Sequence, residues 1–69
     1  MSDIKWVLVF STAAQYQAEI VKQMLENNGL EAIVMNKQDS SYPMLGEADV
    51  LVSEEHEKKA RKLIEEFES

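Results

Sequence analysis

The first apolar run of the chain, residues 4–10, is short and rich in β-branched and aromatic side chains. Such a run is typical of a β-strand. Residues 13–28 then carry apolar side chains at helical spacing along one side. Thr12, with Gln15 three positions later, matches a capping box, and Gly29 stands where a left-handed C-cap is favoured. The N-terminal part of the chain is therefore predicted to form a strand and then a helix.

The rest of the chain predicts two more strands and a second helix. Leu30–Met35 is a short apolar segment with β-branched residues at its centre, and Asn36–Gly46 is a polar loop that holds the single proline. In Glu47–Val52 a small apolar residue occupies every second position, which predicts a third strand. Ser53 is a favourable N-cap, and an amphipathic helix is expected from there to about Phe67.

The predicted order, β-α-β-β-α, indicates an α+β fold with one three-stranded sheet. Strands two and three follow each other directly and can pair antiparallel, whereas a helix joins strands one and two. The simplest arrangement places the third strand between the other two, in the order 1-3-2, with both helices on one face. This is the ferredoxin-like arrangement without its last strand. Residues 1–69 are expected to form a single domain.

Two sets of side chains compete for the sheet face beneath the helices. The small apolar residues of the third strand, at positions 48, 50 and 52, are uniform, so we expect them under the helices together with Val7 and Val9 of the first strand. The face opposite the helices, called the open face below, would then carry Trp6, Leu8, Phe10, Ile33, Met35 and Leu51. A sheet face this apolar is not usually left in water.

Three coverings of the open face are consistent with the sequence. The segment Tyr42–Leu45 could fold back over it, a second copy of the chain could dock on it, or a different protein could bind there. The reverse assignment, with the large residues under the helices and the valines in water, would remove this surface. The first hypothesis is therefore a non-enzymatic binding or regulatory module that self-associates or docks a protein through the open face.

The absence of a fourth strand in the predicted order would leave strand one at a sheet edge. Edges are usually blocked by charge, proline or a bulge. Lys5 is the one charged residue in this strand. We therefore expect the edge to pair with another chain, most simply a second copy.

The composition of the chain argues against several classes of partner and location. The chain has 69 residues, a formal net charge of −6, no cysteine and one histidine. No stretch is basic, so neither nucleic acid nor an anionic membrane surface is expected as a partner. No apolar run approaches the roughly 20 residues of a membrane span, and the first residues lack the order of a secretion signal. A cytoplasmic protein is expected.

Catalytic chemistry is scarce in the sequence. His56 lies between two glutamates early in the last helix and is interpreted as a solvated residue rather than a general base or metal ligand. The lack of cysteine excludes a thiol nucleophile. We therefore expect no enzymatic activity, no metal and no cofactor.

One polar segment allows a second hypothesis. The candidate binding loop comprises Asn36, Lys37, Gln38, Asp39, Ser40, Ser41 and Tyr42. Loops on rigid scaffolds often carry function, but Asx and Ser side chains also stabilise local turns. The segment is thus either a turn-rich connector or a ligand-binding loop, and the latter would make the protein a small-molecule sensor.

Several short segments are similar to a known family of small bacterial proteins. They are Phe10-Ser11-Thr12, Tyr16 with Ala18-Glu19-Ile20-Val21-Lys22, Leu25-Glu26 with Gly29, the segment Asn36 to Tyr42, Gly46-Glu47 and Val50-Leu51-Val52. Together they resemble the family labelled putative prokaryotic signal transducing protein over almost the whole chain. The resemblance implies an α/β sandwich akin to the nitrogen-regulatory PII and ferredoxin-like folds, a cytosolic bacterial protein and a signalling role, and it carries over no catalytic residue.

Overall fold

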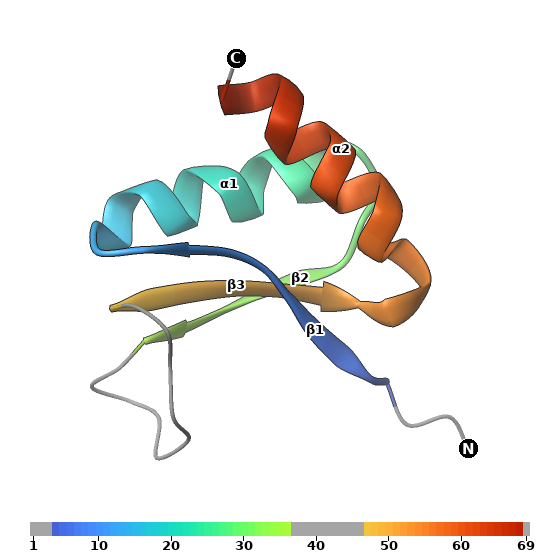
Figure 1. The fold of residues 1–69 in the computed structure, drawn as a ribbon, viewed down its shortest axis with the longest axis horizontal. Helices are drawn as coiled ribbons and strands as arrows, with labels where there is room; N and C mark the ends of the chain where they lie inside the picture. The colour runs from blue at the N-terminus through green and yellow to red at the C-terminus, as the bar shows by residue number, and fades with distance from the viewer. Residues whose placement is uncertain (1–3, 37–46, 69) are drawn as a thin grey trace.

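The computed structural model describes residues 4–36 and 47–68. Within these residues the elements follow the predicted order, and a short turn of 3₁₀-helix is added before the last helix (Figure 1). They are β1 (Trp6–Thr12), α1 (Gln15–Asn27), β2 (Ala32–Asn36), β3 (Ala48–Ser53), η2 (Glu54–His56) and α2 (Glu57–Glu68). The β-α-β-β-α prediction is therefore confirmed, and the boundaries differ from the predicted ones by one or two residues at most ends.

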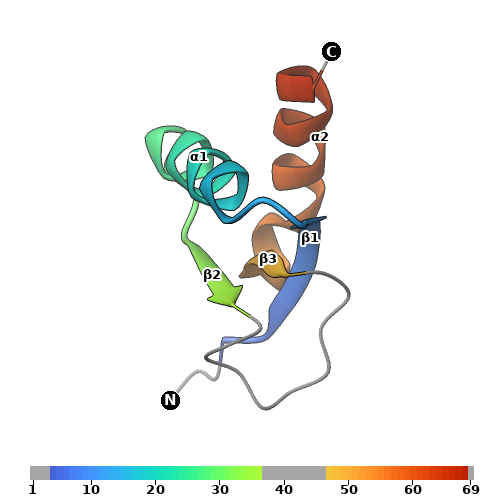
Figure 2. The same cartoon turned by 90° about the vertical axis from the view of Figure 1, so that its left-hand side faces the viewer.

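The sheet has the order β1-β3-β2, and β3 pairs antiparallel with both neighbours. Both helices lie on one side of the sheet (Figures 1 and 2). The predicted order 1-3-2 and the placement of the helices are thus confirmed. α1 runs roughly along β3, whereas α2 rises steeply away from the sheet beside α1 (Figures 1 and 2).

The hydrophobic core lies between the helices and the sheet. Ala48, Val50 and Val52 of β3 are completely buried and belong to the same cluster as Val21 and Leu25 of α1. Because side chains alternate along a strand, every second residue of the central strand points at the helices. The small apolar set of the third strand therefore lies under the helices, as predicted, and the reverse assignment is wrong.

The two ends of α1 differ in how well the sequence predicts them. The capping-box prediction is wrong, because Thr12 still belongs to β1 and the N-cap is Ala14, which has no side-chain cap. Thr12 Oγ1 instead accepts a hydrogen bond from the Ala14 N–H at 3.1 Å. At the other end Gly29 has φ +83°, and the Leu30 N–H donates to the Leu25 carbonyl at 3.0 Å. This is the predicted left-handed cap, in its Schellman form.

The second helix begins less abruptly than the sequence predicts. Ser53 ends β3, its side chain makes no cap hydrogen bond, and η2 intervenes before α2. The Glu54 N–H donates to the Lys5 carbonyl at 2.9 Å, which extends the pairing of β1 and β3 by one bond. The start of α2 is therefore fixed to the first strand by the backbone and not by a serine cap.

Candidate functional site

The open face of the sheet is defined by the residues of β3 that alternate with its buried valines. Leu51 has Leu8 and Ile33 as its cross-strand partners, and Asp49 has Ser11 and Met35. Directly opposed residues on paired strands share a face. The described open face therefore consists of Trp6, Leu8, Ser11, Ile33, Met35, Asp49, Leu51 and Ser53.

A β-bulge changes the predicted composition of this face. The pairing of β1 with β3 shifts between Leu8 and Phe10, so that Val9 is the extra residue. Phe10 consequently pairs with Val50 and packs against the core on the helix side. Beyond the bulge the alternation is reversed relative to a regular strand. The prediction that Phe10 lies on the open face is therefore wrong, and Ser11 takes its place.

Burial varies across the open face. Leu51 is 7% exposed and Asp49 is 1% exposed, so both central residues are shielded from solvent. The flanking apolar residues Trp6, Leu8, Ile33 and Met35 are half-buried. No helix in the described parts of the chain lies over this side of the sheet (Figure 2). The segment Tyr42–Leu45, named above as one possible cover, lies outside the described residues.

The polar feature of the open face is a serine–aspartate pair. Ser11 Oγ donates a hydrogen bond to Asp49 Oδ1 at 2.8 Å. The second carboxylate oxygen, Asp49 Oδ2, is buried and has no hydrogen-bond partner among the described residues. Removing a carboxylate from water is unfavourable unless donors replace the water. The Ser11 hydroxyl therefore compensates part of the free energy required to bury Asp49.

We expect Ser11→Ala to lower the free energy of unfolding by about 1–3 kcal/mol, because it leaves a buried carboxylate without a donor. A double variant, Ser11→Ala with Asp49→Val, should recover most of this loss, since both polar partners are then gone. Urea denaturation of the four members of this mutant cycle measures the coupling. Ser53→Ala is the matched control, with an expected change within about 0.5 kcal/mol; an equal loss in the control would contradict the assignment.

One residue of the predicted binding loop, Asn36, lies within the described residues. Asn36 ends β2 and pairs with Ala48, and its buried Oδ1 atom has no hydrogen-bond partner within residues 4–36 and 47–68. Lys37, Gln38, Asp39, Ser40, Ser41 and Tyr42 lie outside the described residues. Whether this segment is a turn-rich connector or a ligand-binding loop therefore stays open, and the ligand-binding role stays a prediction.

Two further features bear on function, namely possible metal ligands and possible membrane-spanning helices. The described residues include no group of three or more His, Cys, Asp or Glu side chains arranged to hold a metal ion, and His56 lies in η2. Neither described helix is long and apolar enough to cross a membrane.

Comparison with known proteins gives one family. Residues 6–68 match the family model described as "Putative prokaryotic signal transducing protein". No curated protein and no solved structure matches the chain significantly. The family match covers both helices and all three strands of the sheet.

Proposed function

This chain belongs to the family described as putative prokaryotic signal transducing protein, and on that premise we propose that it is a non-enzymatic regulatory module of the cytoplasm. It transmits a signal by docking another protein chain on its open face. A second copy of the chain is the first partner to test, because a two-fold dimer needs only one self-complementary surface.

The partial exposure of the flanking apolar residues of the open face carries this proposal, although the central Leu51 and Asp49 are shielded. Trp6, Leu8, Ile33 and Met35 remain half-buried on a side of the sheet that no described helix covers (Figure 2). Monomeric proteins rarely expose contiguous apolar patches larger than roughly a few hundred Å², and larger patches commonly mark interaction sites. Aromatic and methionine side chains are enriched at protein interfaces. The proposed contact would use Trp6 and Met35 as anchors at opposite ends of the face.

The non-enzymatic part of the proposal rests on the sequence. The chain has no cysteine and one histidine, and these are the residues most often used for nucleophilic and general acid–base catalysis. The carboxylate on the open face, Asp49, is already engaged by Ser11. This arrangement suits a recognition surface better than a reaction centre.

The decisive variant is Leu8→Glu, which places a charge in the middle of the half-buried apolar set. We expect it to weaken self-association, or capture of a protein partner, at least roughly tenfold, while far-UV circular dichroism stays unchanged. Sedimentation at high micromolar concentration and affinity capture from a bacterial lysate measure the two forms of association. Gln23 is exposed on α1, so Gln23→Glu introduces the same change of charge away from the open face and should behave like the wild type.

Two outcomes would contradict the proposal. One is a wild-type chain that stays monomeric and captures no protein in a Leu8-dependent manner. The other is an unfolded Leu8→Glu variant, since that result would make Leu8 a core residue and not part of a docking surface.

A further inference from the structure

The outer side of β1 is an edge of the described sheet. The order β1-β3-β2 gives β1 one neighbour, so its other side faces away from the sheet. Backbone groups along such an edge can pair with a strand from another chain. The sequence alone predicts that this edge pairs with another chain, most simply a second copy, because Lys5 is the one charged residue in the predicted strand, residues 4–10.

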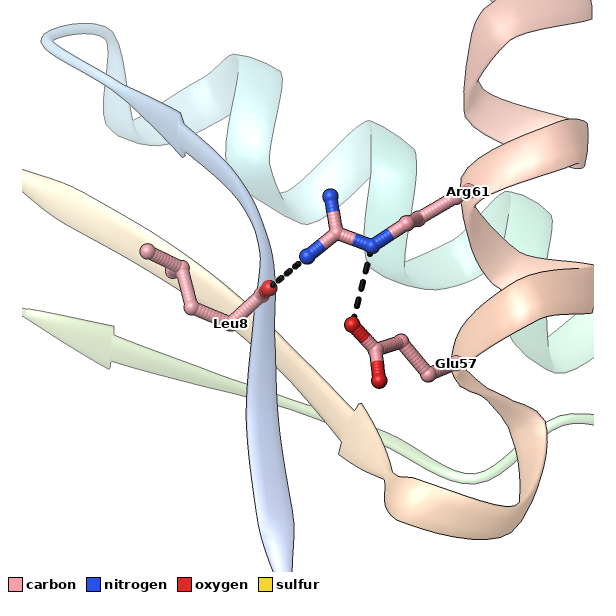
Figure 3. Close-up of polar contacts among 3 residues, drawn as sticks. All are labelled: Leu8, Glu57 and Arg61. Carbon is pink, nitrogen blue, oxygen red and sulfur yellow. Dashed lines mark hydrogen bonds and ion pairs between the residues drawn. The ribbon is translucent and has the colours of Figure 1, made fainter.

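An arginine from the second helix occupies this edge. Arg61 Nη2 donates a hydrogen bond to the Leu8 carbonyl oxygen at 3.1 Å. In Figure 3 the Leu8 carbonyl points toward the guanidinium group, and the Leu8 side chain extends the other way. The contact joins residues 53 positions apart in the sequence.

A glutamate one turn earlier in α2 holds the arginine in place. Arg61 Nε lies 3.0 Å from Glu57 Oε2, an i,i+4 ion pair (Figure 3). The guanidinium group therefore uses one N–H on the helix and another on the strand. Its planar donors are fixed relative to one another, which suits this two-sided contact better than a lysine ammonium.

The bulge lies directly beside this contact. Val9 is the extra residue of β1, and Leu8 is the last residue before the shift in pairing. A bulge interrupts the regular spacing of backbone donors and acceptors that an added strand requires. Two independent features thus interrupt the edge at the same place, the bulge in the backbone and the arginine on the Leu8 carbonyl.

We propose that Arg61 guards the β1 edge and keeps a second copy of the chain from adding its own β1 there. An incoming strand needs the Leu8 carbonyl as an acceptor, so it must displace the guanidinium group. It must also bring that charge, or its ion pair with Glu57, into a drier environment. The proposal reverses the expectation drawn from the sequence and is independent of docking on the open face.

The test is Arg61→Ala, compared with Lys62→Ala, which removes the same charge from the next position of α2. We expect Arg61→Ala to lower the dissociation constant for self-association at least roughly tenfold, and Lys62→Ala to leave it unchanged. Hydrogen exchange of the β1 amides should slow with increasing concentration in Arg61→Ala alone. Arg61→Lys should fall between the two, because it keeps the charge but loses the planar fork.

A second substitution separates the edge from the open face. Met35→Glu alters the open face on β2, away from the β1 edge, so edge pairing in Arg61→Ala should survive it. Loss of the association in the double variant would assign the contact to the open face and overturn the proposal. Identical oligomeric state and β1 exchange in Arg61→Ala and the wild type would also overturn it. If Arg61→Ala does not fold, the same comparison is made with Arg61→Gln.

Discussion

Val50→Asp is expected to unfold the domain. Val50 lies at the centre of the middle strand, and its side chain is completely buried in the core that both helices share with the sheet. A carboxylate there has no donor to replace its water, which costs several kcal/mol in addition to the lost apolar contacts. The whole free energy of unfolding of a chain this size is about 3–10 kcal/mol. Far-UV circular dichroism should therefore show loss of both helices at 25 °C.

The neighbouring Asp49 makes this substitution a strict test of which face of the sheet packs against the core. Asp49 is a natural aspartate on the same strand, and it is as buried as Val50 but points to the open face. Val50→Ala is the matched control, with an expected loss of about 2 kcal/mol and a preserved cooperative transition. A Val50→Asp variant that melts cooperatively near the wild-type temperature would contradict the assignment of the core.

Phe10→Glu is expected to destabilise the protein strongly, in contrast to Leu8→Glu two residues earlier. In a regular strand these two positions share a face, and the bulge at Val9 separates them. Phe10 packs against the core beneath the helices, so the substitution removes apolar burial and places a charge there. We expect a loss of about 3 kcal/mol or more, which corresponds to a melting temperature lower by roughly 12–24 °C.

Thermal denaturation of both variants in the same buffer measures the contrast. If Phe10→Glu and Leu8→Glu shift the melting temperature equally, the bulge does not separate their environments. Deletion of Val9 supplies a further control, because it restores strict alternation with Phe10 still facing the helices and should preserve the fold.

The order of elements could be predicted because each signal is local. In the third strand, the alternating small apolar residues Ala48, Val50 and Val52 indicate which side is buried. Gly29 indicates where α1 ends, because glycine readily adopts the left-handed conformation of a C-cap. The sheet order then follows from connection lengths and pairing rules. Membership of the family, which the matching residues indicated, is likewise confirmed.

The bulge could not be predicted, because residues 6–10 are apolar at every position. A continuous apolar run gives no alternation, so an extra residue leaves no trace in the pattern. For this reason the sequence wrongly predicts Phe10 on the open face, and it does not indicate that Ser11 is the partner of Asp49. Their hydrogen bond joins residues 38 positions apart, and no spacing rule links such distant positions. The Leu8–Arg61 contact could not be predicted for the same reason, because it joins residues 53 positions apart.

The central place of β3 has a consequence for biosynthesis. β3 lies between the other strands, although it is the last of the three along the chain. A nascent polypeptide that has reached residue 47 contains β1, α1 and β2 but lacks β3, the native pairing partner of both strands. Sheet formation must therefore await emergence of residues 48–53 from the ribosome. Until then the two apolar strand segments lack their native partner, and unpaired segments of this kind favour aggregation.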